Sequence, residues 1–240
     1  MQILCIGNSF SRDALRYLHQ IARADGVEIC AVNLYIGGCP LNLHYRNMLS
    51  EEKAYILDVN GTDTGFKVSL KEALLSREWD YISFQQVSIL SGNFDTYEPY
   101  LSLLSQYVKK YAPKAKQIIH QTWAYEEGSE RLMTLMGYKQ HRDMHNELKK
   151  AYNMAVKSIN ADMLIPAGDV FLKLTEKGVS HIFRDTQHAS LGIGRYALGL
   201  IWYRFLTKKD IAENTFIDFD ETISQGDIKT IKECVMSVKL

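Results

Sequence analysis

The chain has 240 residues, of which 46% are hydrophobic, so it can bury one sizeable core, and nothing in its length requires a second domain. Its 28 basic and 28 acidic residues cancel and no dense basic cluster is present, which argues against nucleic acid and anionic membranes as partners. We therefore expect a single domain over residues 1–240 that acts on a small molecule.

No apolar run reaches the length of a membrane span, and the first strand pattern begins at residue 2 with no leader sequence before it. We expect a cytoplasmic protein as the sequence stands, or one whose signal peptide has been removed. The cysteines lack the Cys-x-x-Cys spacing of a zinc or thioredoxin site, so we expect four reduced thiols: Cys5, Cys30, Cys39 and Cys234.

Short apolar runs alternate with longer amphipathic stretches along the chain, and this alternation is typical of a parallel α/β sheet. In chain order, the predicted strands are residues 2–6, 28–35, 80–84, 116–121 and 162–165. The predicted helices are residues 12–24, 69–77, 97–111, 140–160, 168–176 and 191–206. Two further runs, 55–58 and 66–69, flank an Asn60-Gly61 turn signal and predict a small hairpin insertion.

These elements predict a three-layer α/β/α sandwich with a central, mainly parallel sheet. The carboxyl ends of its strands meet at one edge, where ligands of such sheets bind. We expect the loops over residues 42–60 and 88–97 to shape specificity, because loops on a rigid scaffold carry such variation.

Ser9 lies where the first strand pattern gives way to a helical pattern. At such a turn a serine hydroxyl can be exposed at the strand end, with its backbone N–H aligned with the helix dipole. Near the other end of the chain, Asp185 and His188 lie three residues apart, so that one tight loop can face both side chains toward Ser9. These residues supply every side chain of a Ser-His-Asp triad.

Two more segments follow predicted strands: Gly37-Gly38 after the second and Gln85-Gln86 at the end of the third. Acyl transfer needs donors for the oxyanion of a tetrahedral intermediate as well as a nucleophile and a base. Since the ends of parallel strands converge at one edge, we expect these segments to lie beside Ser9.

These blocks resemble the SGNH/GDSL hydrolase superfamily, and within it a branch of small bacterial esterase-like proteins known as a domain of unknown function. The first block of that superfamily, usually Gly-Asp-Ser-Leu, reads Gly7-Asn8-Ser9-Phe10 here. Gly38 matches the second block, and Asp185 to His188 match the last, Asp-x-x-His. The third block departs from the usual Gly-x-Asn-Asp and reads Phe84-Gln85-Gln86-Val87-Ser88.

The resemblance implies a serine esterase with the SGNH fold that needs no cofactor and no metal. His188 would take the proton of Ser9, Asp185 would hold the imidazole, and the backbone N–H groups of Ser9 and Gly38 would bind the oxyanion. Some carbohydrate-esterase relatives carry a glutamine after the third-block strand, and a carboxamide donates the same N–H as asparagine. We therefore expect Gln85 to complete the oxyanion hole, with Gln86 as the alternative.

The implied substrate is a short acyl ester, most plausibly acetyl, of a carbohydrate or a small metabolite. A second hypothesis is a non-catalytic protein that binds a small molecule or carbohydrate on the same scaffold, and the unusual third block motivates it. A third, an anion-binding loop at residues 7–11, is disfavoured because the segment lacks the lysine and the glycine density of a P-loop. The oligomeric state does not follow from the sequence.

Several other residues admit two interpretations. His141 and His145 lie four apart on a predicted helix, a spacing that can chelate zinc, but no third ligand is evident and we expect an exposed pair. Trp123 and Tyr125 follow a predicted strand and either line a substrate pocket or pack in the core. His44 either adjoins the pocket or packs on a helix face, and Ser11 is expected to cap a helix.

Overall fold

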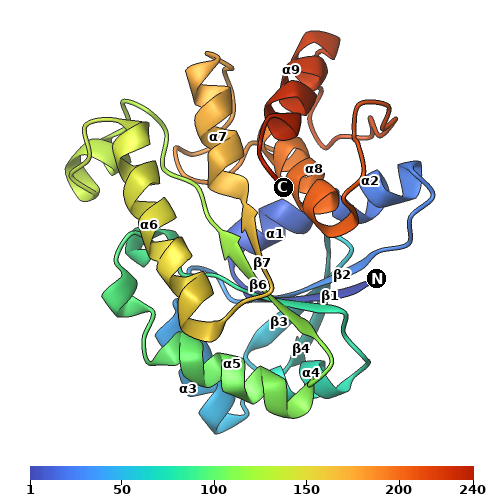
Figure 1. Ribbon diagram of the computed structural model, residues 1–240, viewed down its shortest axis with the longest axis vertical. Helices are drawn as coiled ribbons and strands as arrows, with labels where there is room; N and C mark the ends of the chain where they lie inside the picture. Colours follow the sequence, from blue (N-terminus) through green and yellow to red (C-terminus); the bar gives the residue numbers. More distant parts are fainter.

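The fold is built on one sheet of seven strands in the computed structural model, which describes residues 1–240. Across the sheet the strands run in the order β4-β3-β2-β1-β5-β6-β7 (Figure 1). Their bounds are β1 Gln2–Gly7, β2 Cys30–Tyr35, β3 Tyr55–Val59, β4 Thr62–Val68, β5 Tyr81–Phe84, β6 Lys116–Gln121 and β7 Met163–Pro166. The pairs among β2, β1, β5, β6 and β7 are parallel, whereas β3 pairs antiparallel with β2 and β4.

Helices cover both faces of this sheet, so the predicted three-layer α/β/α architecture is confirmed (Figure 1). On one side lie α3 (Leu41–Ser50), α4 (Leu70–Leu75) and α5 (Tyr100–Tyr111). The other side holds α1 (Ser9–Leu15), α2 (Leu18–Ala24), α7 (Ala167–Glu176), α8 (Ile193–Thr207) and α9 (Gln225–Met236). Helix α6 (His141–Ile159) packs against both α5 and α7. None of the helices combines the length and hydropathy that a membrane span requires.

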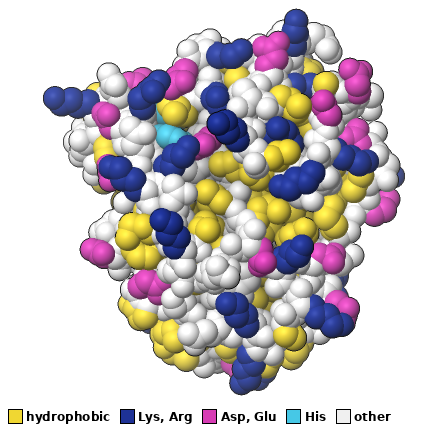
Figure 2. Space-filling model, in the orientation of Figure 1, with side chains coloured by type: hydrophobic (Ala, Val, Ile, Leu, Met, Phe, Trp, Pro, Cys, Tyr) yellow, Lys and Arg dark blue, Asp and Glu magenta, His cyan; other side chains and the backbone are white.

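Strand β1 lies in the middle of the sheet, and its side chains form part of the hydrophobic core on both faces. Its residues Ile3 to Ile6 are at most 1% exposed, as expected for a strand whose two faces are both covered by helices. Helix α8 is apolar almost all round, and Gly199 lets it approach α2, since a Cβ there would lie 2.6 Å from Ile21 Cδ1. On the outer surface both signs of charge are interspersed (Figure 2), and the four cysteines form no disulfide.

Four expectations about the elements need correction. The helix predicted over residues 12–24 is two helices: α1 begins earlier, at Ser9, and ends before Tyr17, which is the N-cap of α2. The hairpin is present, but its strands β3 and β4 extend the main sheet instead of forming a separate insertion. The expected loop 42–60 contains α3, whose buried face includes His44 and Asn47, so that polar residues obscure its period. Helix α9 was not predicted.

The expectation of an exposed histidine pair on α6 is wrong. His141 and His145 are 1% and 2% exposed and continue the buried face that runs through Met144 and Leu148. His141 Nδ1 lies 2.8 Å from the carbonyl oxygen of Tyr125, and His145 Nε2 lies 3.2 Å from Asp169 Oδ1. No cluster of three or more potential metal ligands forms around them or elsewhere.

Buried histidines make the fold sensitive to acid. Burial lowers the pKa of His44 to about 3, that of His120 to about 3 and that of His141 to about 4. In the unfolded chain a histidine has a pKa of about 6.5, so below that pH the unfolded state binds more protons. The free energy of unfolding is therefore greatest above about pH 6.5 and falls as the pH drops toward about 4.

We expect each of these histidines to contribute about 1.4 kcal/mol per pH unit to that fall. Urea unfolding of the wild type and of a His44→Gln variant between pH 7 and pH 4.5 measures the contribution of one of them. The unfolding free energy of the variant should fall less steeply with decreasing pH, by about 1.4 kcal/mol per pH unit, which corresponds to one proton fewer. Equal slopes in the two proteins would contradict the account of His44.

Candidate active site

The turn between β1 and α1 presents Ser9 at the first position of a helix. Asn8 is the N-cap, and its side-chain Oδ1 accepts from the backbone N–H of Phe10 at 3.0 Å. Ser11, which was expected to cap a helix, takes part in the capping box as its N3 residue and accepts from the Asn8 N–H at 3.0 Å. Gly7 makes room for this arrangement, because a Cβ at residue 7 would lie 2.0 Å from Ser11 Oγ.

The structure brings Ser9, His188 and Asp185 into one chain of hydrogen bonds. His188 Nε2 lies 2.8 Å from Ser9 Oγ, and His188 Nδ1 lies 2.7 Å from Asp185 Oδ2. The other carboxylate oxygen, Asp185 Oδ1, accepts from the backbone N–H of His188 at 2.8 Å. Partial burial alone would raise the pKa of Asp185, but the backbone and ring of His188 outweigh it and lower the pKa, which keeps the carboxylate ionised.

An ion pair on the buried carboxylate of Asp13 ties the loop of Asp185 and His188 to helix α1. Arg184 Nη1 donates to both carboxylate oxygens of Asp13, at 2.9 and 3.0 Å, and also to the carbonyl of Ala189. Arg195 Nε donates to the same carboxylate at 2.9 Å. Because Asp13 is 1% exposed and lies one turn along the helix that begins at Ser9, this cluster holds that helix against the loop.

The segment after β6 holds the same loop from its other side. Trp123 Nε1 donates to the carbonyl of Gln187, and the backbone N–H of Glu126 donates to the carbonyl of Thr186, both at 2.8 Å. The Trp123 ring is fully buried and stacks on Phe10 with a centroid distance of 4.2 Å. Tyr125 is also buried, so of the two interpretations for this pair of aromatics the core position is the correct one.

Three N–H groups lie at the strand ends around Ser9. The Ser9 N–H is at the first helical position and has no acceptor within its helix. Gly38 is exposed, has a positive φ of 60°, and its N–H makes no hydrogen bond within the protein. Gln85 Nε2 has two hydrogens, of which one is donated to Asn8 Oδ1 at 2.7 Å. Each of these groups therefore has a hydrogen that no protein acceptor takes.

Asn8 joins these strand ends through its side chain. Its Nδ2 donates to the carbonyl of Cys39 at 3.1 Å, while its Oδ1 accepts from Gln85. The Oε1 of Gln85 lies 2.8 Å from Nδ1 of His120, which fixes the orientation of the carboxamide. A continuous hydrogen-bonded chain thus crosses the ends of the neighbouring strands β2, β1, β5 and β6.

The neighbouring glutamine has a different set of partners. Gln86 Oε1 accepts from the backbone N–H groups of Leu41 and Val87, at 3.0 and 2.9 Å. Its Nε2 donates to the carbonyl and hydroxyl oxygens of Thr96. Gln86 therefore anchors loops, whereas Gln85 reaches the turn that carries Ser9. His44 takes no part in either network, because it is fully buried with its Nδ1 3.1 Å from Tyr55 Oη.

The sequence alone singled out Ser9, Asp185 and His188, which the structure brings together, but missed the groups that position them. The burial of Asp13 leaves no clear signal, because Arg12 precedes it directly and Arg16 follows three residues later, so the segment reads as an ordinary charged helix face. The roles of Trp123 and His120 leave no signal either, because each acts through one hydrogen bond across the fold.

Comparison with family models matches residues 2–234 to a family described as a domain of unknown function, DUF4886. The chain belongs to the DUF4886 family. It is 30% identical to a DUF4886 family protein from Bacteroides uniformis ATCC 8492, whose crystal structure aligns with a TM-score of 0.89 over 98% of this chain and 93% of that one.

More distant solved structures share the architecture of this DUF4886 protein. A proposed SGNH hydrolase from Slackia heliotrinireducens is 22% identical and aligns with a TM-score of 0.60 over 86% of this chain and 98% of its own. The acetyl xylan esterase AlAXEase is 14% identical, with a TM-score of 0.56 over 85% and 98% of the two chains. The expected SGNH fold is thereby confirmed. No curated protein sequence matches the chain significantly.

The double role of Asn8 as donor and acceptor gives a testable prediction. In Asn8→Asp the carboxylate cannot donate to the Cys39 carbonyl, and it places a charge in a buried site. We expect the free energy of unfolding at pH 7 to fall by about 1–3 kcal/mol, as for other buried groups left without a partner. Urea unfolding measures the change.

Asn93→Asp is the matched control, because Asn93 is an exposed cap that only accepts, from the N–H of Asp95, and a carboxylate accepts equally well. Its stability should stay within about 0.5 kcal/mol of the wild type. Equal stabilities of the two variants would contradict the central role given to the Asn8 carboxamide.

Proposed function

We propose that this DUF4886 protein is a serine ester hydrolase in which Ser9, His188 and Asp185 form the catalytic triad. The observation that carries the proposal is the chain of two short hydrogen bonds, Ser9 Oγ to His188 Nε2 at 2.8 Å and His188 Nδ1 to Asp185 Oδ2 at 2.7 Å. A serine, an imidazole and a carboxylate in this relation are the groups that nucleophilic acyl transfer requires.

In the proposed reaction Ser9 Oγ attacks the ester carbonyl carbon while His188 Nε2 takes the hydroxyl proton. Asp185 keeps the Nδ1–H tautomer and stabilises the imidazolium that forms. The tetrahedral intermediate collapses as His188 returns the proton to the departing alcohol, which leaves an acyl group on Ser9. Water, activated by His188, then attacks that acyl group and releases the carboxylic acid.

The oxyanion of each tetrahedral intermediate would be bound by the N–H groups of Ser9, Gly38 and Gln85. All three have a hydrogen that no protein acceptor takes. Gln86 is a poorer candidate than Gln85, since its Nε2 already has two acceptors on Thr96, whereas Gln85 Nε2 has one acceptor, on Asn8. Removal of one oxyanion donor typically costs about 10²–10³ in turnover.

For the substrate we propose a short acyl ester, most plausibly acetyl, of a carbohydrate or a small metabolite. The shared architecture with the acetyl xylan esterase AlAXEase supports the class of ester. A non-catalytic binding protein on the same scaffold is the competing hypothesis, and the glutamine in place of the usual third-block asparagine is the feature that favours it.

Hydrolysis of p-nitrophenyl esters from acetate to octanoate tests the proposal. We expect the wild type to prefer acetate, and Ser9→Ala and His188→Ala to lose about 10⁶ in turnover or to fall to the uncatalysed rate. Gln85→Ala should lose about 10²–10³, which separates a supporting group from an essential one.

His181→Asn is the control, since His181 is exposed and lies seven residues before His188 at a positive φ that asparagine tolerates. It should retain wild-type turnover, and circular dichroism checks the folding of every variant. Hydrolysis that survives in folded Ser9→Ala protein would contradict the proposed nucleophile. A wild type inactive on every ester would favour the binding protein.

A further inference from the structure

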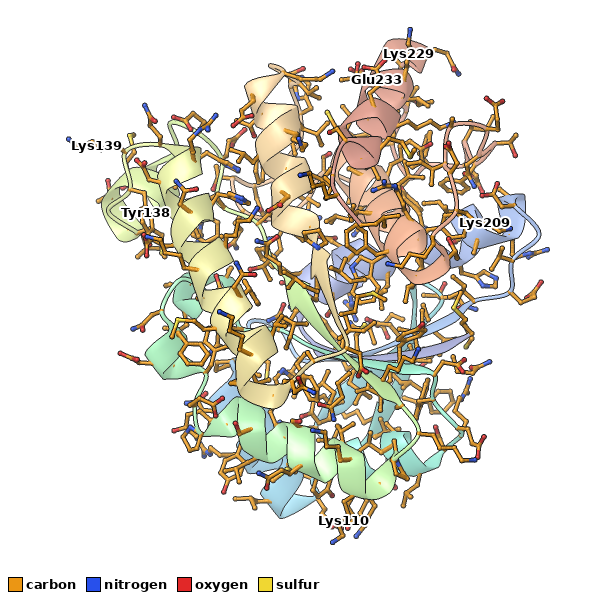
Figure 3. All side chains as sticks on the ribbon, in the orientation of Figure 1. Lys110, Tyr138, Lys139, Lys209, Lys229 and Glu233 are labelled. Atoms are coloured by element: carbon orange, nitrogen blue, oxygen red, sulfur yellow. The ribbon has the colours of Figure 1, made fainter.

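The chain between β6 and α6 forms one side of a hollow that borders the loop of Asp185 and His188. This segment, lime in Figure 1, projects beside one end of α6 and contains a short π-helix, Arg131–Leu135. Tyr138 and Lys139, which follow it, lie at the outer margin of the molecule (Figure 3). The segment is joined to the loop of the triad through the hydrogen bond from Glu126 N–H to the Thr186 carbonyl.

Between this segment and that loop lies an open cavity of about 530 Å³. Its walls are formed by Glu130, Arg131, Thr134, Leu135 and Thr186. The volume falls within the range of small-molecule sites. Because Thr186 follows Asp185 directly in the chain, this cavity borders the loop that carries Asp185 and His188.

Thr186 has a backbone conformation that its side chain disfavours. Its φ is +68°, in the left-handed region, where a β-branched residue is a genuine outlier. Such a conformation is stable only when its surroundings impose it, and it occurs most often at functional sites. Glycine or asparagine would fit this position with less strain, so the side chain that lines the cavity is the feature to be explained.

The walls of the cavity carry both donors and acceptors. Arg131 donates, Glu130 accepts, and the hydroxyls of Thr134 and Thr186 do both. The guanidinium of Arg131 is held near the Tyr125 ring, 5.6 Å from its centroid. A strongly charged ligand would meet a like charge at either Arg131 or Glu130, whereas a neutral polyhydroxyl compound can pair with all four side chains. Leu135, 55% exposed, offers an apolar surface for the C–H face of a sugar ring.

We propose that this cavity is the leaving-group subsite and that it binds the sugar alcohol of an acetylated carbohydrate. The inference rests on the proposed esterase function, and it adds the substrate class and the residues that select it. Thr186 then connects the two parts of the site, with its side chain toward the sugar and its neighbour Asp185 toward the imidazole.

The test compares an acetylated methyl xyloside with p-nitrophenyl acetate as substrates. In Arg131→Met, KM for the acetylated xyloside should rise about tenfold while kcat changes less than threefold, as expected when one charged hydrogen bond to the leaving group is lost. Thr186→Gly should raise the same KM without lowering Tm, because glycine relieves the backbone strain. Lys150→Met, on the exposed face of α6, is the control and should leave KM unchanged.

Binding is measured separately by titrating the acetylated xyloside into Ser9→Ala protein, with and without Arg131→Met. If p-nitrophenyl acetate is hydrolysed but neither variant changes KM or binding of the xyloside, the subsite is wrong and the esterase function stands. If the xyloside binds and Arg131→Met weakens its binding, but no ester is hydrolysed, the subsite stands and the esterase function is wrong. Absence of both binding and hydrolysis would overturn both proposals.

Discussion

The arrangement around Ser9 depends on the carboxamide of Asn8. It caps helix α1, accepts from Gln85 and donates to the carbonyl of Cys39, which requires an acceptor and a donor on one side chain. An aspartate, the usual residue of the superfamily at this position, can only accept when ionised. The neutral amide therefore suits a site in which Gln85 occupies the third block, and the two departures from the usual motif explain one another through the hydrogen bond between them.

A second constraint acts from the other side of the turn. Asp13 is buried and pairs with Arg184 and Arg195, so helix α1 and the loop of Asp185 and His188 are held together. Breaking a buried ion pair by removing one partner costs about 3–5 kcal/mol in other proteins, because a charge is left unpaired. The hydrogen bond between Ser9 and His188 thus rests on contacts that lie behind these two side chains.

The sequence was sufficient for the parallel sheet and for the meeting of Ser9 with Asp185 and His188, because both leave local patterns: apolar runs of strand length, and reactive side chains at their ends. It was not sufficient for α3, where His44 and Asn47 occupy buried positions and obscure the apolar period. It also placed His141 and His145 at the surface, although the face of α6 that buries Leu148 continues through both. Polar side chains buried by partners distant in the sequence are what a local pattern cannot reveal.

The most direct test of this account is labelling with a fluorophosphonate probe, followed by peptide mass spectrometry to locate the modified residue. The account predicts a single adduct on Ser9 in the wild type, with labelling strongly slowed in His188→Ala and in Asp13→Asn, since both changes disturb the base. Labelling at another serine, or no labelling of the folded wild-type protein, would contradict the assignment of Ser9 as an activated nucleophile.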